Sequence, residues 1–519
     1  MGAANGHDES LRLPRTRQET QVVLLPYLSV SVVVGGVGPP PGIRGYRLLR
    51  LLEPARPGWV SQSPRAGWLV VATVCIGAFM GQLDASIVTV ALPRLSTDLR
   101  VGVNAVEWVS LSYLLTLVAL VAPIGAWADA VGRKALYLAG FALFTLASLA
   151  CAFAPNLAVL CALRVAQAVG AALLQANSVA LIAANSPPGR LGRAIGVQAA
   201  AQAIGLALGP ALGGLLLTWG SWRLLFLVNV PAGLLGIATG IVLLPRSRDL
   251  IRHRPLDRFG LALFVPVVAL SLLALSLVAG RGGGRLAALP VGLLGAALFA
   301  GFVRQQRRAT APLLDLGLLR QPVLSRGLLA GLGGYAVLFG ALLVVPFFLT
   351  SAHLASVGAA GLVLAALPLG IGVIAPVAGR ISDRRPRLMA VGGLAAAGAG
   401  LLLMAALRPT GLALGLLLGL LGLGLGAFTP ANNSAVMGAA GRGRTGAAAG
   451  LLNMTRGLGT AVGTAVAALT FAAVTGGRTS LPAAAARDGF TAVTLVLAAV
   501  AVLGAAISAR RDPSEADLR

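Results

Sequence analysis

A series of long apolar runs between Gly67 and Ser508 is the feature that most constrains this sequence. Many of the runs approach the ~20 residues that a helix needs to cross the hydrocarbon core of a membrane. The chain is 57% hydrophobic and 11% charged, whereas a soluble globular protein carries about 25% charged residues. The sequence therefore predicts an all-α polytopic membrane protein.

We predict fourteen membrane-spanning helices, and the even number places both termini on one side of the membrane. Loops after even-numbered spans hold most of the loop arginines, so we expect those loops and both termini to be cytoplasmic, in a cell (plasma) membrane. This distribution accounts for the formal net charge of +25 without a nucleic-acid partner. The predicted spans are residues 67–92, 105–128, 134–154, 157–184, 193–217, 223–245, 259–280, 286–303, 326–350, 356–379, 388–407, 411–434, 446–475 and 490–509.

A charged turn joins the second and third predicted spans. Its spacing, Gly-x-x-x-Asp-x-x-Gly-Arg-Lys, is formed by Gly125, Asp129, Gly132, Arg133 and Lys134. Spans joined by so short a connection must be antiparallel, and glycine lets their backbones approach closely. A carboxylate at a helix start is favoured by the helix dipole, and an adjacent arginine can clamp it. We predict a cytoplasmic gate, and a positively charged loop without further role is the alternative.

A second copy of this spacing follows the tenth span, where Gly379, Asp383 and Arg387 stand in the same register and Pro386 replaces the second glycine. Two six-helix halves related by an axis along the membrane normal account for such a repeat. The seventh and eighth spans are then an inserted pair. The predicted division is an N-terminal tail without fixed structure (1–64), an N-terminal six-helix bundle (65–250), the inserted pair (251–305), a cytoplasmic amphipathic segment (306–325), a C-terminal six-helix bundle (326–510) and a cytoplasmic tail (511–519).

Two charged residues lie deep inside predicted spans, Asp84 in the first and Arg164 in the fourth. An isolated charge in hydrocarbon costs on the order of 3 kcal/mol, so each should face a cavity or a partner, or the acid should carry a proton. Arginine keeps its proton, so its expected role is to act electrostatically on a carboxylate or a substrate. We predict that both take part in proton coupling. A structural carboxylate and a structural ion pair are the alternatives.

Several amides on the predicted spans can line a central cavity. Helical spacing places Gln167 and Gln175 on the same face as Arg164. Helix-to-helix hydrogen bonding is an equally good explanation for the asparagines. The predicted cavity residues are Gln167, Gln175, Gln198, Gln202, Asn432, Asn433 and Asn453.

The fifth span carries glycines at fixed offsets. Starting at Gly196, the spacing is Gly-x8-Gly-x3-Gly-Pro-x2-Gly-Gly. Glycines on one stripe permit close helix contact, and proline can kink a helix by removing a backbone hydrogen bond. Packing alone would explain scattered glycines but less readily so many at fixed offsets. The motif consists of Gly196, Gly205, Gly209, Pro210, Gly213 and Gly214.

These motifs resemble the major facilitator superfamily, and in particular its fourteen-helix drug:proton antiporter family of the multidrug efflux type. The charged turn resembles that superfamily's signature between helices 2 and 3, and the fifth-span motif resembles its antiporter signature. The run around Asp84 resembles Leu-Asp-x-Thr-Ile-Val-Asn-Val-Ala-Leu-Pro, with Ser86 and Thr89 at the Thr and Asn positions. Arg164 matches an intramembrane Arg-x-x-Gln-Gly, except that Ala168 stands where the glycine is usual.

The resemblance covers about Gly67 to Ser508, including Trp222 to Gly233 at the sixth span and Gly450 to Gly459 at the thirteenth. It implies the major facilitator fold and an antiporter that exports lipophilic drugs, antibiotics or metabolites in exchange for protons. The expected partners are a small-molecule substrate, protons and membrane lipid, with the chain monomeric.

Two other transport modes and a different class of protein stay open at this stage. A proton symporter or uniporter for a small nutrient is one alternative, and a non-transporting receptor or scaffold is another. An enzyme is not expected, because the three histidines, His7, His253 and His353, lie outside the predicted spans and no catalytic or metal-ligand spacing occurs. Without a Gly-x-x-x-x-Gly-Lys-Ser/Thr loop, ATP-driven pumping is not expected either, and no cofactor or metal is predicted.

Overall fold

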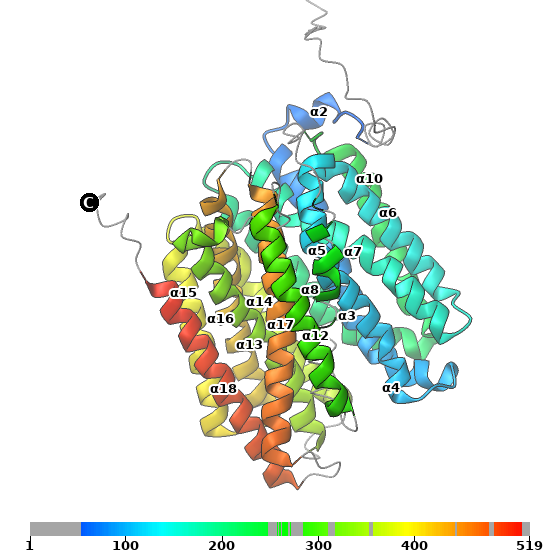
Figure 1. Ribbon diagram of the computed structural model, residues 1–519, viewed down its shortest axis with the longest axis vertical. Coiled ribbons are helices and arrows are strands. Elements are labelled where there is room, and N and C mark those ends of the chain that lie inside the picture. Colours follow the sequence, from blue (N-terminus) through cyan, green and yellow to red (C-terminus); the bar gives the residue numbers. More distant parts are fainter. Residues whose placement is uncertain are drawn as a thin grey trace, which may run out of the picture. The chain divides into compact units, whose positions relative to one another are not determined.

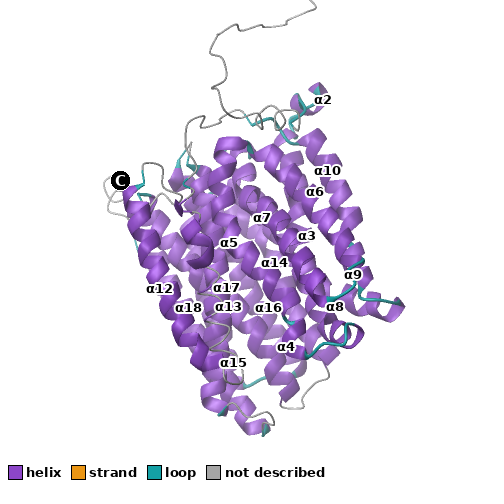
Figure 2. Cartoon of the chain, turned by 45° about the vertical axis from the view of Figure 1, so that its right-hand side comes forward, coloured by secondary structure: helices purple, strands orange, loops and turns teal. Residues whose placement is uncertain are grey.

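The computed structural model describes residues 53–247, 257, 259–260, 262–267, 270, 274, 284–309, 317–351, 357–441, 444–476 and 482–510. Within these ranges every regular element is a helix (Figure 2). Twelve helices of the described part are long and apolar enough to cross a membrane. The expected all-α membrane architecture is thereby confirmed for the described residues.

The membrane-spanning helices fall into an N-terminal and a C-terminal bundle, blue to cyan and yellow-green to red in Figure 1. The first comprises α3 (Ala66–Asp98), α5 (Trp108–Val131), α6 (Arg133–Ala152), α7 (Leu157–Asn185), α8 (Leu191–Trp219) and α10 (Asn229–Leu243), with the short α4 (Val103–Val106) and α9 (Arg223–Leu227) between them. The second comprises α13 (Pro322–Ser351), α14 (Val357–Ser382), α15 (Pro386–Leu407), α16 (Gly411–Ala440), α17 (Thr445–Thr475) and α18 (Ala483–Ala509).

One further helix, α12 (Gly284–Arg308), covers the predicted eighth span. The predicted seventh span lies largely outside the described residues, so the total of fourteen stays a prediction. Two parts of the inserted pair do meet, since the rings of Phe264 and Phe302 lie 5.3 Å apart and Gln306 Nε2 donates to Asp257 Oδ2 at 2.7 Å.

The predicted amphipathic segment, residues 306–325, is divided between neighbouring helices where it is described. Its first residues continue α12, and its last belong to α13, which begins at Pro322 after a short 3₁₀ turn, η1 (Leu318–Arg320). Residues 310–316 lie outside the described part. The helices on either side therefore extend further into this segment than the predicted bounds indicated.

The two bundles meet mainly where α8 packs against α14 and α5 packs against α17, with smaller contacts of α8 with α16 and of α7 with α17. Glycine makes the first crossing possible. A Cβ added to Gly196 would overlap the carbonyl oxygen of Ala375, and one added to Gly379 would overlap that of Gly192. Because any side chain at these positions would push the backbones apart, the glycines set the close approach of the two halves.

Inside the N-terminal bundle the same helix, α8, packs against α3. A Cβ added to Gly209 would overlap the hydroxyl of Ser86, whereas one added to Gly214 would meet nothing within 4 Å. Pro210 has no N–H to donate to the carbonyl of Leu206 one turn earlier. Ser86 Oγ donates to that carbonyl at 2.8 Å instead, so α3 replaces the bond that proline removes. Gly214, in contrast to the other motif glycines, is not a contact position.

The segment just before α3 is bound to the N-terminal bundle. The Glu53 carboxylate accepts hydrogen bonds from the backbone N–H of Ala135 at 3.1 Å and the hydroxyl of Ser247 at 3.0 Å. The short helix α2 (Gly58–Ser61) follows. The predicted tail, residues 1–64, is therefore too long at its C-terminal end, because residues from Glu53 onward make specific contacts that a composition-based boundary could not reveal.

Candidate transport site

The two charged residues that the sequence places deep inside predicted spans, Asp84 and Arg164, lie side by side in the structure. Arg164 Nη1, from α7, donates to Asp84 Oδ2, from α3, at 2.6 Å. The side chains are 1% and 0% exposed, respectively. This is a buried ion pair, in which removing either partner would leave an uncompensated charge inside the protein.

Neutral side chains complete the coordination of the carboxylate. Gln167 Nε2 donates to Asp84 Oδ1 at 2.8 Å, and Asn229 Nδ2 from α10 donates to the same oxygen at 2.9 Å. Gln167 also accepts a bond from Arg164 at 2.7 Å and donates one to Ser148 of α6 at 2.8 Å. We call Asp84, Ser148, Arg164, Gln167 and Asn229 the charged cluster; it ties four helices of the N-terminal bundle together.

The guanidinium of Arg164 is also held from α5. Its Nε donates to the carbonyl of Val109 at 3.1 Å, and its Cζ lies 4.1 Å from the centre of the Tyr113 ring. A cation over an aromatic face is stabilised by the ring quadrupole. Arg164 is therefore held by α3, α5 and α7, and any change in the charge of Asp84 would affect α5 as well as α7.

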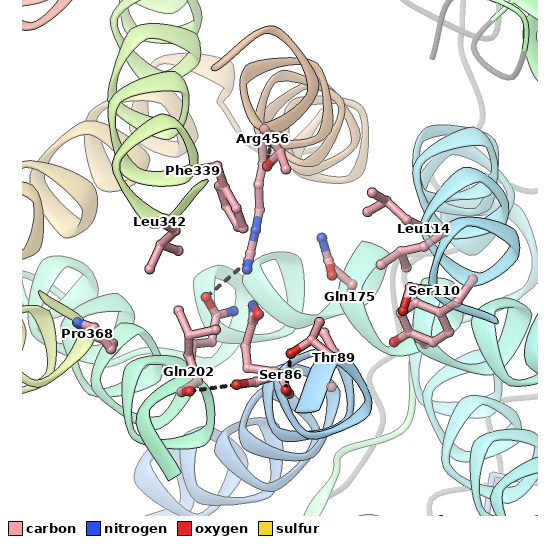
Figure 3. Close-up of a pocket in the computed structure, with 18 of the residues that line it drawn as sticks. Ser86, Thr89, Ser110, Leu114, Gln175, Gln202, Phe339, Leu342, Pro368 and Arg456 are labelled. Atoms are coloured by element: carbon pink, nitrogen blue, oxygen red, sulfur yellow. Dashed lines mark hydrogen bonds between the residues drawn. The ribbon is translucent and has the colours of Figure 1, made fainter. Parts of the chain in front are cut away.

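A cavity of about 530 Å³ lies between the two bundles, beside the charged cluster. Both bundles line it: Arg164, Tyr113 and Gln202 come from the first, and Phe339 and Arg456 come from the second (Figure 3). Its volume is within the 300–1,000 Å³ typical of sites for drug-sized ligands. Asp84 stays behind this wall, so its carboxylate reaches the cavity through Arg164.

The cavity is displaced toward one end of the helices. We call the end that carries Gly132, Arg190 and Arg385 the basic end. The lining residues of α14, from Gly361 to Pro368, lie in the half of that helix remote from the basic end, as do those of α13 and all of those of α5 except Val121, whereas the lining residues of α7 and α17 reach past the middle of their helices toward the basic end. The bundles therefore diverge around the cavity and converge at the basic end.

At the basic end, contacts run from one bundle to the other. Asp383 Oδ1, just after α14, accepts a hydrogen bond from the backbone N–H of Gly192 at 2.6 Å, and Oδ2 accepts one from Arg193 at 3.4 Å. These are the first free N–H groups of α8, where a carboxylate is favoured. Burial raises the pKa of Asp383, although these hydrogen bonds act in the opposite direction. Arg133 Nη2 donates to Thr445 Oγ1 at 2.8 Å and joins α6 to α17.

For two residues predicted for this gate, the described hydrogen bonds lie within their own bundle. Lys134 is fully buried, and its Nζ donates to the carbonyls of Pro54 at 3.0 Å and Leu244 at 2.7 Å. These bonds connect it to the segment before α3 and to the end of α10, both on the side of the N-terminal bundle. Arg387 donates to the carbonyl of Ala509 at the end of α18, inside its own bundle. In both cases a cation satisfies carbonyls that a helix end leaves free.

The remaining gate residues of the first copy lie in α5 or directly after it. Gly125 lies within α5, and Gly132 follows that helix with φ of 115°, a conformation that favours glycine. Asp129 belongs to α5, but its side chain lies outside the described part, so its role stays a prediction.

The predicted cavity amides divide into three groups. Gln175, Gln202 and Asn453 line the cavity, and Asn453 Nδ2 donates to the carbonyl of Gln175 across the bundles at 3.1 Å. Gln198 and Asn433 line a small adjoining pocket of about 20 Å³. Gln167 and Asn432 do not line the cavity: the first belongs to the charged cluster, and the second is buried where α16 packs against Gly327 and Gly331 of α13.

Sequence reasoning missed three residues of the site. Asn229 and Arg456 were noticed only as parts of family-like runs, and Tyr113 was not noticed. Arg456 had a usable signal, since a charge inside an apolar span is functional by default. Asn229 and Tyr113 carry no such signal, because one amide or one ring within a span predicts no particular partner. Among the described residues, no group of three or more His, Cys, Asp or Glu side chains could hold a metal ion.

Paired six-helix bundles that converge at one end and enclose a cavity define the class of this protein as a secondary transporter. The model of the family described as Major Facilitator Superfamily matches residues 74–464, and the chain belongs to that family. It is a multi-pass membrane transporter and not an enzyme.

Known relatives and a solved structure agree with this assignment. The chain is 31% identical over 402 residues to the riboflavin transporter RibZ of Clostridioides difficile (strain 630), covering 77% of this chain and 87% of that one. It is 32% identical over 407 residues to the multidrug resistance protein Stp of Mycobacterium tuberculosis (strain CDC 1551 / Oshkosh), covering 78% and 75%. The crystal structure of the human organic anion transporter MFSD10 (TETRAN) shares the fold, with a TM-score of 0.61 at 18% identity, over 86% of this chain and 100% of that one.

Proposed function

We propose that this transporter is a proton-coupled antiporter that exports lipophilic drugs, antibiotics or related metabolites across the cell membrane by alternating access. The observation that carries the proposal is the buried Asp84–Arg164 pair behind the wall of a cavity that both bundles share. Asp84 is the proton-carrying group, and Arg164 transmits its charge state to the cavity.

Protonation of Asp84 changes the charged cluster in a definite way. The neutral carboxyl no longer compensates Arg164, and a buried cation without a counter-ion is costly. Asn229 can adjust to the change: its Nδ2 donates to the ionised carboxylate, and its Oδ1 has no hydrogen-bond partner among the described residues. An amide that turns over can accept a bond from the protonated carboxyl with that oxygen.

The protonated cluster favours a different arrangement of α3, α6, α7 and α10, because these four helices hold it, and of α5, which holds Arg164. Substrate and proton are then coupled, provided that each binds the two states of the transporter unequally. A proton that moves down a potential of 100 mV supplies ~2.3 kcal/mol, enough to concentrate a substrate usefully against its gradient.

Alternating access follows from the two ends of the bundles. With the basic end and both termini in the cytoplasm, as the loop charges favour, the described arrangement is closed inside and has its cavity toward the outside. Return to the inward-open state requires the Asp383 contacts with Gly192 and Arg193 and the Arg133 bond to Thr445 to break. These contacts form the cytoplasmic latch.

The names of two relatives support two different candidate functions. The name of Stp supports export of drugs, and the fifth-span motif resembles the antiporter signature. The name of RibZ favours a second candidate function, transport of a vitamin-like nutrient by symport or uniport. The direction of proton-driven movement separates the two candidates.

The test uses inside-out membrane vesicles with an imposed proton gradient, acidic inside, and the fluorescent compounds riboflavin, fluorescein and rhodamine 123. We expect the wild type to accumulate at least one of them when the gradient is present, and Asp84→Asn to lose that accumulation. Asp98→Asn is the matched control, since Asp98 lies at the end of the same helix, 30% exposed and paired with Arg94.

Undiminished gradient-driven accumulation by Asp84→Asn would remove Asp84 from coupling. Loss of vesicle contents on acidification of the lumen, in place of accumulation, would favour symport. Both readouts are independent of which compound is transported.

A further inference from the structure

We infer that the substrate of this transporter is an amphipathic molecule with an anionic group, and that Arg456 binds that group in the cavity. The inference names the substrate class of the proposed function and rests on it for transport. Binding itself can be measured without any transport, so the two can fail separately.

The charges around the cavity do not balance. Arg164 and Arg456 line it, and no aspartate or glutamate is among its lining residues in the described part of the chain. The charge of Arg164 is compensated by Asp84. Among the described residues no carboxylate lies within 4.0 Å of Arg456. One positive charge at the cavity is thus left without a counter-ion.

The position of Arg456 fits a ligand-binding role. It lies in the middle of α17, is half-buried, and extends into the cavity (Figure 3). Its Nη1 donates to Gln202 Oε1 at 3.0 Å, and its Cζ lies 5.5 Å from the centre of the Tyr335 ring. A guanidinium has five N–H donors in a planar fork that suits carboxylate and related anions. A single bond to a neutral amide leaves most of that capacity available to a ligand.

The rest of the cavity suits an apolar body. Leu114 and Leu342 lie on opposite sides of Arg456, with Phe339 beside it (Figure 3). A ligand with one anionic end and an apolar remainder would place its charge against the guanidinium and its body against these side chains. Arginine in a water-poor site interacts with an anion more strongly than it would in bulk water.

A cationic substrate fits this cavity poorly. Its charge would be repelled by Arg456, and the acid behind the cavity wall, Asp84, is already bound by Arg164, Gln167 and Asn229. Reaching Asp84 would mean breaking the buried ion pair. The charge arrangement therefore selects against cations and for anions.

A competing explanation is that Arg456 acts only as a second latch between the bundles, separate from the cytoplasmic latch. It belongs to the C-terminal bundle and Gln202 to the N-terminal one, so their bond also joins the two halves. The latch requires only the bond, whereas anion recognition requires the positive charge. Variants of the two partners distinguish these roles.

The experiment compares fluorescein and rhodamine 123, which share a xanthene skeleton but are respectively anionic and cationic near pH 7. Their binding to the purified full-length protein in lipid nanodiscs is followed by fluorescence anisotropy. We expect the wild type to bind fluorescein more tightly. In Arg456→Gln the affinity for fluorescein should fall ~10-fold or more, as for the loss of a charged hydrogen bond, while Arg456→Lys should retain the preference.

Gln202→Ala is the control for the latch, because it removes the bond and keeps the charge. We expect it to retain the preference for fluorescein over rhodamine 123. The inference is overturned if the wild type binds fluorescein no more tightly than rhodamine 123, including binding neither, or if Gln202→Ala abolishes the preference as fully as Arg456→Gln. Retained anion binding with no proton-driven accumulation in vesicles would instead contradict the proposed function alone.

Discussion

Arg164 and Arg456 are both arginines within apolar helices, and both line the same cavity, one from each bundle. Arg164 is 1% exposed and bound to a carboxylate, whereas Arg456 is half-buried and bound to a neutral amide. The first is held by the protein itself; the second has capacity for a ligand. The difference shows that the partner, rather than the charge, decides what an intramembrane arginine does.

The same difference separates the two bundles. The N-terminal bundle contains the charged cluster, in which the Asp84 carboxylate is bound by Arg164, Gln167 and Asn229, and it is suited to an internal change of charge. The C-terminal bundle contributes the cation that is left for substrate. Communication between them then has to pass through the surfaces where the bundles meet.

The largest expected effect is on stability, where the two arginines should behave differently. Arg164→Gln leaves the Asp84 carboxylate buried without its counter-ion and should cost about 3–5 kcal/mol. Arg456→Gln removes one hydrogen bond and should cost about 1 kcal/mol. Unfolding of the purified variants in detergent measures both losses.

The double variant Asp84→Asn with Arg164→Gln removes both charges and should recover much of the stability that Arg164→Gln loses. Equal losses for the two single variants would show that the arginines are energetically alike, and the comparison between them would not stand.

A smaller effect is expected where α8 crosses α14 at Gly196. This crossing connects the bundles but includes neither the charged cluster nor Arg456. Gly196→Ala places a Cβ against the carbonyl of Ala375, and overpacking of this kind costs about 1–3 kcal/mol. Transport in vesicles should fall, while fluorescein binding at Arg456 should be retained. Gly214→Ala is the matched control from the same motif, because nothing lies within 4 Å of its added Cβ. Unchanged transport in Gly196→Ala would show that this crossing is not part of the moving contact.

The sequence predicted the helical class, the paired bundles and the need of Asp84 and Arg164 for a partner or a cavity, because each rests on a local rule. Apolar length predicts a span, and a charge within a span requires a partner. The choice among polar residues on one helix face was beyond such rules: Gln167 and Gln175 share a face, yet only Gln175 lines the cavity.

Non-local contacts account for the other differences. Lys134 was assigned to the gate from its motif, but its carbonyl partners come from Pro54 and from the end of α10 at Leu244, far apart in the sequence. Gly214 matched the motif, although only its neighbours in the motif lie against α3. Spacing along one helix cannot show which neighbouring helix, if any, a given position meets.

Proton release on substrate binding tests the central claim most directly, since it shows whether binding of the substrate displaces a proton from the transporter. The purified transporter in a weakly buffered detergent solution is mixed with whichever compound the vesicles accumulate, and the pH is followed with an electrode. The account predicts that the wild type releases protons on binding and that Asp84→Asn binds the compound without releasing them. Equal proton release by the two proteins would contradict it.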